Sequence, residues 1–296
     1  MIINILNTSD KQRVKGIYQV AGHCFEVSGK KLCKAVESID GFAPFRIDEG
    51  KVLFSFVEGN IAPEMRKVLY NFTCEDVAGT FGKTEQGYLL TLKPQEERKA
   101  VSLWHNKDEK EVFLSGDWSS SLCRFAMWLG LGLMVAPYHT VAIHSSCIVY
   151  YGKAVLFLGE SGTGKSTHTR LWREHIKGAF LLNDDSPFLR VEEGKIWVYG
   201  SPWSGKTPCY KQERYELAGC VRLSQAPHNR ITKLPILQAY GAIHPSCPPA
   251  FAYDEALYDH ISRIISHLLS SIPFYHLECL PDREAAQLSF STIFEI

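Results

Sequence analysis

Short apolar runs alternate with turn-forming residues in the first third of the chain. The runs IYQVAGHCFEV, FRIDEGKVLFSFVEG, GYLLTLKP and VSLWHNKDEKEVFLSGD are rich in β-branched and aromatic residues. Polar segments at 48–50 and 106–110 provide reversals between alternating segments. This pattern predicts antiparallel sheet, and we expect a β-rich N-terminal domain over residues 1–118. It contains no catalytic constellation, so recognition of a partner or substrate is its expected role.

A long apolar helix is predicted next. Serines at 119–121 can cap it, its apolar body runs to Ala136, and Pro137 ends it. The most apolar run, 125–136, has 12 residues, fewer than the roughly 20 that a membrane-spanning helix needs. The opening MIINILNTSDKQRVKG lacks the pattern of a signal peptide. We therefore expect a buried helix, no membrane partner and a cytoplasmic location.

The second part of the chain, 119–296, reads as an α/β domain with a mixed sheet. Strands are predicted at 141–151 and 154–158, and the second leads directly into GESGTGKST. A helix, a buried strand ending in acids and a hairpin at 188–200 follow. Apolar residues at helical spacing after Asp254 predict a helix that ends at Pro273, then a strand, FYHLECL, and a last helix, DREAAQLSF.

The segment at 159–167 has the pattern of a phosphate-binding loop. Its glycines permit positive φ and close backbone approach, no proline removes an amide donor, and a helix can begin at the lysine with its positive end facing an anion. The residues expected to bind nucleotide phosphates are Gly159, Glu160, Ser161, Gly162, Thr163, Gly164, Lys165, Ser166 and Thr167.

A second match to the same pattern lies at 199–208, YGSPWSGKTP. Pro202 removes one amide donor, and Pro208 keeps Thr207 from helical dihedrals where a helix should start. This segment is therefore not predicted to be a second phosphate loop. Two interpretations remain: a surface reversal, or a lip beside the substrate in which Lys206 reaches a phosphate and Trp203 gives a flat apolar contact.

Paired acids follow the strand after the loop. Asp184 and Asp185 come 19 and 20 residues after Lys165, and with the Ser166 hydroxyl they are predicted to hold Mg²⁺, which prefers one or two protein oxygens beside phosphate. Successive strand side chains point to opposite faces, so one acid is expected on the metal and the other as base for an acceptor hydroxyl. The sequence leaves open which acid has which role. His144, predicted on the preceding strand, is a further catalytic candidate.

The run from 143 to 187 resembles the core of HPr kinase/phosphorylase and its relatives, which share a P-loop domain with phosphoenolpyruvate carboxykinase. The likeness rests on the histidine before the hairpin, on G-x-S-G-x-G-K-S-T and on the paired aspartates. It implies that His144, Asp184 and Asp185 take part in transferring phosphate to a serine hydroxyl, and that Arg230, in a segment similar to a strand–turn–strand element of kinase-like relatives, adds positive charge near phosphate. The glycine-rich signature that follows the acids in the bifunctional enzymes is absent, so a divergent member is expected.

We therefore expect an enzyme that uses ATP and Mg²⁺ to phosphorylate a hydroxyl, with serine of a protein or peptide as acceptor. The alternatives are a nucleotide-dependent switch without transfer and, less favoured, a carboxykinase-like enzyme. Basic and acidic residues both total 32, so no net field favours nucleic acid. Nine scattered cysteines without a C-x-x-C pair indicate reduced thiols and no zinc. Relatives often assemble, which makes a homo-oligomer a further expectation.

Overall fold

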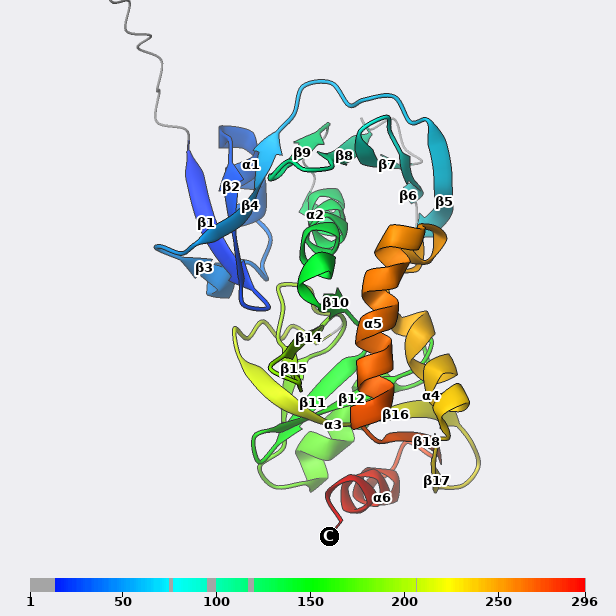
Figure 1. Ribbon diagram of the computed structural model, residues 1–296. Helices are drawn as coiled ribbons and strands as arrows, with labels where there is room; N and C mark the ends of the chain where they lie inside the picture. Colours follow the sequence, from blue (N-terminus) through cyan, green and yellow to red (C-terminus); the bar gives the residue numbers. More distant parts are fainter. Residues whose placement is uncertain (1–13, 75–76, 95–99, 117–119, 206, 296) are drawn as a thin grey trace, which may run out of the picture.

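The computed structural model describes residues 14–74, 77–94, 100–116, 120–205 and 207–295. The chain is mixed α/β, with two large mixed sheets. Figure 1 shows the first sheet arching over helix α2 (Ser120–Val135) and the second sheet lying on the far side of this helix. The predicted domain boundary at residue 118 falls outside the described residues. One cluster of buried apolar side chains extends from Tyr18 to Phe274, so both halves of the chain contribute to the same core.

The first sheet has the strand order β3-β1-β2-β4-β9-β8-β7-β6-β5. Its elements are β1 (Lys15–Val20), β2 (His23–Ser28), α1 (Lys30–Glu37), η1 (Ala43–Phe45), β3 (Arg46–Ile47), β4 (Val52–Glu58), β5 (Lys67–Cys74), β6 (Val77–Lys83), β7 (Gly87–Pro94), β8 (Val101–Asn106) and β9 (Glu111–Ser115). The expectation of a wholly antiparallel sheet is wrong, because β4 runs parallel to both β2 and β9. Parallel neighbours need a crossover, and α1, whose Leu32 and Val36 are buried, lies in the connection from β2 to β4.

Helix α2 is a core helix, as its sequence predicts. It packs against β8 of the first sheet and β10 of the second. By length and composition the stretch Ser121–Tyr138 could cross a membrane, with a mean hydropathy of 1.2, but 61% of it is buried inside the molecule. The burial explains the apolar composition without a bilayer.

The second sheet has the order β10-β14-β15-β16-β12-β11-β13, with β18 added beside β16 and β17 beside β18. The strands are β10 (Thr140–Ala142), β11 (Ser146–Tyr150), β12 (Lys153–Leu158), β13 (Phe180–Asn183), β14 (Phe188–Glu192), β15 (Lys195–Tyr199), β16 (Arg214–Gln225), β17 (Arg230–Lys233) and β18 (Phe274–Cys279); the helices are η2 (Ala136–Tyr138), α3 (Lys165–His175), α4 (Ile236–Ile243), η3 (His244–Ser246), η4 (Pro249–Tyr253), α5 (Glu255–Ser271) and α6 (Arg283–Phe294). Strand β16 is parallel to β12 and β18, and the other pairs are antiparallel.

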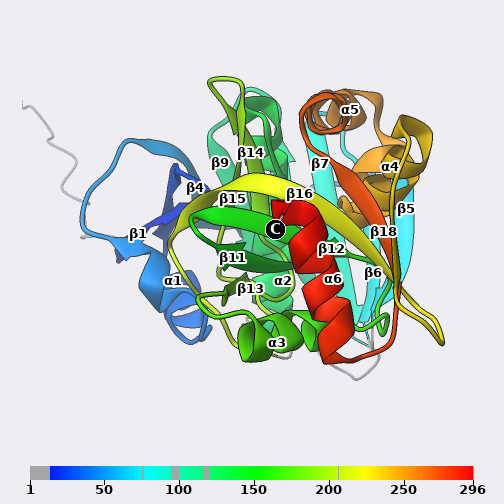
Figure 2. The ribbon, with the colours of Figure 1, turned by 90° about the horizontal axis from the view of Figure 1, so that it is seen from below.

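Strand β12 shows how the second sheet is covered on both faces. Leu156 and its alternate neighbours belong to the core shared with α2 and α5, whereas Val155 and Phe157 pack in a second cluster with Trp172 of α3 and Ala286 of α6. Figure 2 shows α3 and α6 side by side across this second face. A strand buried on both faces reads as a continuous apolar run, which is why AVLFL has no polar alternation.

Two sequence expectations about strands need correction. The predicted strand 141–151 is broken into β10 and β11, because the backbone N–H groups of Ile143, His144 and Ser145 bond to Pro187, Ser246 and Asp185 instead of a neighbouring strand. His144 therefore lies in an irregular segment and not on a strand. The segment 221–235 forms two strands as expected, but β18 lies between them.

The contact between the two sheets contains a buried histidine. His23 Nε2 lies 2.9 Å from Thr140 Oγ1, which itself donates to the Tyr138 carbonyl, so the histidine donates to the threonine. Burial, with a contribution from Arg190, lowers the pKa of His23 from 6.5 to about 3. The folded protein therefore holds this histidine neutral over a pH range in which the unfolded chain binds a proton.

We expect stability to fall as pH falls from 6.5 towards about 3, because the unfolded state binds more protons there. Urea unfolding at about pH 7 and about pH 5 should show a difference of about 1–2 kcal/mol from His23. The variant His23→Gln should reduce this difference. It should not abolish it, because burial also lowers the pKa of His168 to about 4. An unchanged pH slope in His23→Gln would contradict the assignment.

Candidate functional site

The 159–167 loop has the backbone conformation that its glycines predict. Gly159, Gly162 and Gly164 have φ of 144°, 87° and 99°, a region that side chains rarely adopt. Helix α3 begins at Lys165, directly after Gly164. The N-terminal amides of this helix have no intrahelical partner, and with the helix dipole they favour an anion. The loop that follows the buried strand β12 thus has the glycine conformations and the helix start that the sequence predicts for it.

Lys165 folds back over the loop. Its Nζ donates to the Gly159 carbonyl at 2.7 Å, to the Glu160 carbonyl at 3.1 Å and to His144 Nε2 at 3.1 Å. Burial lowers the pKa of Lys165, while Asp185 and Asp184 act in the opposite direction. The ammonium group is therefore held by two carbonyl oxygens of the loop.

The contact with Lys165 fixes the tautomer of His144. A lysine ammonium only donates, so Nε2 of the imidazole must accept and the ring proton lies on Nδ1. Nδ1 lies 3.4 Å from Asp185 Oδ1. The histidine thus links the ammonium group of the loop to a carboxylate on the turn after β13.

Asp185 is half-buried, and its carboxylate is surrounded by donors. Ser186 Oγ donates to Oδ2 at 3.0 Å. Burial raises the pKa of Asp185, but the contact with His144, the Ser186 hydrogen bond and the positive charge of Arg124 outweigh it and hold the pKa below its usual value. Asp185 is therefore ionised at neutral pH.

Asp184 has different surroundings and is buried. Its Oδ1 accepts a hydrogen bond of 2.7 Å from Ser146 Oγ of β11, and its Oδ2 accepts one of 3.2 Å from the backbone N–H of Thr207. Both oxygens are thus engaged by protein donors. The two acids have different partners, as the alternation of side chains along a strand leads one to expect, and Asp185 is the more accessible of the two.

The second glycine–lysine motif packs against the acids. A Cβ on Gly205 would lie 2.8 Å from the Asp184 carbonyl oxygen, and a Cβ on Gly200 would collide with the Lys211 carbonyl oxygen. These glycines permit close packing, and Thr207 donates its amide to Asp184. Trp203 is buried, with its indole N–H bonded to the Arg124 carbonyl at 2.9 Å. Lys206 lies outside the described residues.

Asn183, the last residue of β13, is buried and connects the turn after this strand to the 200–204 loop by hydrogen bonds. The sequence did not single it out. Its Oδ1 accepts from the backbone N–H groups of Asp185 at 3.0 Å and Ser186 at 2.9 Å. Its Nδ2 donates to the Trp203 carbonyl at 3.0 Å and to Ser201 Oγ at 3.2 Å. An asparagine after a strand and before acids is a turn signal. Its contact with the 200–204 loop depends on the tertiary fold.

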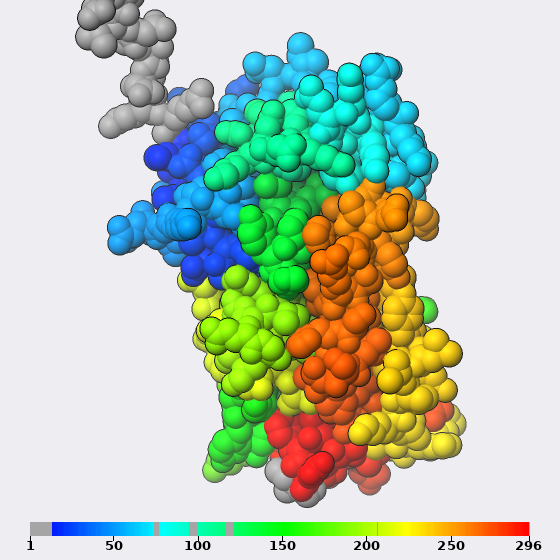
Figure 3. Space-filling model, viewed as in Figure 1, coloured from blue at the N-terminus to red at the C-terminus, as the bar shows by residue number. Residues whose placement is uncertain are grey.

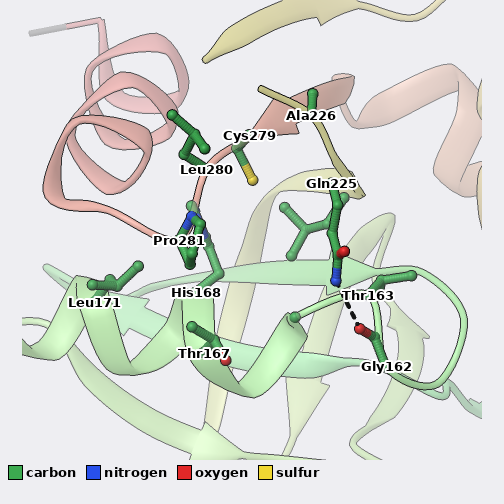
Figure 4. A pocket seen from close by; sticks show the side chains of 12 residues that line it. Gly162, Thr163, Thr167, His168, Leu171, Gln225, Ala226, Cys279, Leu280 and Pro281 are labelled. Atoms are coloured by element: carbon green, nitrogen blue, oxygen red, sulfur yellow. Dashed lines mark hydrogen bonds between the residues drawn. The ribbon is translucent and has the colours of Figure 1, made fainter. Parts of the chain in front are cut away.

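Two cavities lie beside the 159–167 loop and the paired acids. The first, the α3 cavity, has a volume of about 600 Å³ and lies between the 159–167 loop, α3 and the segment 279–281. Figure 4 shows Leu171, Leu280 and Pro281 around it, and the Gln225 side chain bonded to the Gly162 carbonyl at 3.2 Å. The second, the α2 cavity, has a volume of about 650 Å³, and His144 and Asp185 lie in its wall.

The α2 cavity has a wall that combines aromatic and proline side chains with polar and charged ones. Helix α2, the turn after β13, the 203–204 segment and the 245–249 segment enclose it. The residues of its wall are Ser121, Arg124, Phe125, Trp128, His144, Asp185, Ser186, Trp203, Ser204, Pro245, Ser246, Cys247 and Pro249. Trp203 thus lies in the wall of a cavity that Asp185 also lines, while the lip interpretation of this segment stays a prediction.

The protein oxygens near the loop suit a hard cation only if phosphate oxygens provide further ligands. Ser166, in the first turn of α3, and Asp185 offer oxygen, whereas Asp184 already accepts two protein hydrogen bonds. Among the described residues, no three His, Cys, Asp or Glu side chains cluster as a metal cage. Mg²⁺ commonly binds through one or two protein oxygens and substrate phosphates, so the residues fit that ion.

The predicted Arg230 lies apart from Lys165, His144 and Asp185: it is exposed at the start of β17 and lines neither cavity. His168 of α3 lines the α3 cavity, is buried, and lies 3.0 Å from Ser289 Oγ. The eight cysteines whose side chains are described are free thiols, in line with the expectation of reduced cysteines.

No family model matches the chain, and no curated protein matches it either. The interpretation of the site therefore rests on its own geometry.

Proposed function

We propose that this protein is a kinase that uses ATP and Mg²⁺ to phosphorylate a hydroxyl group, with serine of a protein or peptide as the acceptor class. The proposal includes a P-loop kinase fold of the HPr kinase and phosphoenolpyruvate carboxykinase type for residues 119–296. One observation carries it: the contacts from Lys165 through His144 to Asp185 join the 159–167 loop to the wall of the α2 cavity. A donor phosphate and an acceptor hydroxyl would meet at these three side chains.

The nucleotide would lie over the 159–167 loop. The loop amides and the start of α3 would bind the phosphates. The α3 cavity directly beside Gly162 and Gly164 has apolar walls at Leu171 and Leu280, which suit the faces of a base.

The acceptor hydroxyl would approach from the α2 cavity. Asp185, ionised and accessible, would accept the hydroxyl proton as the oxygen attacks the γ-phosphorus and ADP leaves. His144, whose Nδ1 proton faces Asp185, would orient that carboxylate. Lys165 would exchange its carbonyl partners for phosphate oxygens and stabilise the charge of the transferring group.

When bound, Mg²⁺ would neutralise phosphate charge, with Ser166 and Asp185 as the protein oxygens that could hold it. Asp184 would act through the hydrogen bonds that position Ser146 and Thr207.

Lys165→Ala tests the nucleotide site. We expect its Kd for ATP to rise about 10- to 100-fold, because a charged hydrogen-bond donor to phosphate is worth about 1.5–3 kcal/mol. Isothermal titration gives the affinity, and incubation of the wild-type protein with γ-labelled ATP, Mg²⁺ and a lysate should label an acceptor that the variant does not label. Arg170→Ala, on the exposed side of α3, is the matched control.

The same assay separates the alternatives. ATP binding without any labelled acceptor would favour a nucleotide-dependent switch. Release of CO₂ from oxaloacetate in the presence of nucleotide would favour a carboxykinase. An affinity for ATP that is unchanged in Lys165→Ala would contradict the proposed nucleotide site.

A further inference from the structure

One described cation, Arg124, lies in the wall of the α2 cavity together with Asp185, whose pKa its positive charge helps to lower. Among the described residues of its wall, Arg124 is the one arginine or lysine, and no described Asp or Glu forms an ion pair with it. Its Nη2 donates to the Ser204 carbonyl at 2.8 Å, which fixes the guanidinium group. Nη1 has no partner in the described part of the chain, and Nε is buried without one.

A second donor of α2 near Arg124 has no partner among the described residues. Trp128 lies one helical turn after Arg124, on the same face of α2, and its indole N–H is also buried without a partner. These two donor atoms, Arg124 Nε and Trp128 Nε1, are buried and do not face the cavity, so a ligand would bind Arg124 through its Nη groups, of which Nη1 has no partner in the described part of the chain. A negatively charged oxygen on Nη1 would form a charge-assisted hydrogen bond, which is stronger than one between neutral groups.

We propose that the α2 cavity binds an acceptor molecule that carries a carboxylate beside its hydroxyl, with the carboxylate on Arg124, the hydroxyl at Asp185 and an apolar group against the aromatic wall. The transfer step rests on the proposed function, whereas the binding of the carboxylate does not. In that step the hydroxyl oxygen forms a bond to the γ-phosphorus, the bond from this phosphorus to the bridging oxygen breaks, ADP leaves and Asp185 takes the hydroxyl proton.

The geometry favours a carboxylate over a more highly charged group. A single guanidinium matches the planar, singly charged carboxylate in a two-point contact. The ionised Asp185 lies in the same wall and would repel a dianion. Phe125, Trp128 and Trp203 supply ring surfaces for an apolar flank. A free hydroxy acid and the last residue of a peptide both present this pair of groups.

The experiment compares matched acids and amides without nucleotide. The probes are 3-hydroxy-3-phenylpropionate and its amide, and a short peptide ending in serine with a free or an amidated carboxyl end, titrated calorimetrically into the full chain. We expect at least one acid to bind about tenfold or more tightly than its amide. This ratio should fall to about one in Arg124→Met, with the affinity for the amide unchanged. Arg124→Lys keeps the charge and should retain part of the ratio.

The outcomes decide the proposal. The pair with the larger ratio identifies the source of the carboxylate. Equal affinity for acid and amide in the wild-type protein, no measurable binding of any acid at millimolar concentration, or an equal loss for acid and amide in Arg124→Met would each overturn it. Thermal unfolding of both variants shows whether they are folded. No probe contains phosphate. Failure of ATP binding would therefore contradict the proposed function without deciding whether the α2 cavity binds a carboxylate.

Discussion

Asp185→Asn is expected to lower kcat for phosphate transfer about 10³-fold, because the amide cannot accept the hydroxyl proton that the carboxylate takes. Its affinity for ATP without Mg²⁺ should stay within about threefold of the wild type, because Asp185 contacts His144 and Ser186 and not the loop backbone. Single-turnover transfer and calorimetry measure the two quantities separately. A rise in Kd confined to ATP with Mg²⁺ would show that Asp185 also holds the metal.

Asp184→Asn is the matched control. Asp184 accepts from Ser146 and Thr207, and the amide keeps the acceptor oxygen for one of these bonds. We therefore expect a loss of stability of about 1–2 kcal/mol and a fall in kcat of less than about tenfold. A larger kinetic loss in Asp184→Asn than in Asp185→Asn would exchange the roles of the two acids.

Features that depend on neighbours in sequence were predictable. The 159–167 loop follows from glycines that permit positive φ, a preceding apolar strand and a lysine that begins a helix, all within a few residues. The hairpin of β11 and β12 depends on a local turn at 151–152. The helix after Asp254 is also local, because the Asp254 side chain accepts a hydrogen bond from the Leu257 N–H. The conformation of these elements is confirmed, and phosphate binding by the loop stays a prediction.

Strand direction in the first sheet was not predictable from the same signals. Antiparallel hairpins and parallel crossovers use similar apolar alternation, and the difference depends on α1, a helix of eight residues. The break at 143–145 depends on partners far along the chain, Pro187, Ser246 and Asp185. Local pattern favours one long strand there, and tertiary hydrogen bonding overrides it.

The roles of the paired acids were not predictable from local sequence either. Alternation along a strand says that Asp184 and Asp185 face different ways, but the partners that distinguish them come from β11 and from the loop before Cys209. Arg124 is 80 positions from the carbonyl that holds it. In the space-filling view of Figure 3 the N-terminal part packs closely on the rest of the molecule, so such contacts follow from the assembled fold.

The second glycine–lysine motif has a physical explanation that neither sequence interpretation contained. Gly205 lies against the Asp184 backbone, and Thr207 donates to the Asp184 carboxylate. The sequence motif consists of small residues beside a lysine. Small residues are needed where two loops pack closely together, just as they are where a loop binds phosphate, so the motif alone does not distinguish the two. The segment packs against Asp184 and its neighbour Asp185. Trp203 and Ser204 form part of the α2 cavity wall.

Asn183→Leu is expected to have the largest effect on stability. The substitution keeps a similar volume but leaves the N–H groups of Asp185 and Ser186 without their acceptor, whereas the Trp203 carbonyl keeps the Ser201 hydroxyl as a donor. At about 1–3 kcal/mol for each unsatisfied group, we expect the free energy of unfolding to fall by about 3 kcal/mol or more. Denaturant unfolding measures this loss.

Because Asn183 holds the turn that carries Asp185, kcat should fall in Asn183→Leu even under conditions in which the variant is fully folded, while ATP without Mg²⁺ still binds. Ser201→Ala removes one contact of the Asn183 amide and the hydrogen bond that Ser201 Oγ donates to the Ser186 carbonyl, but it keeps both bonds that Asn183 Oδ1 accepts from the turn. It should therefore cost stability and lower kcat less than Asn183→Leu does. If Ser201→Ala and Asn183→Leu reduced kcat equally, the 200–204 loop rather than the turn would position the carboxylate. Positioning of Asp185 by Asn183 requires that the two variants differ.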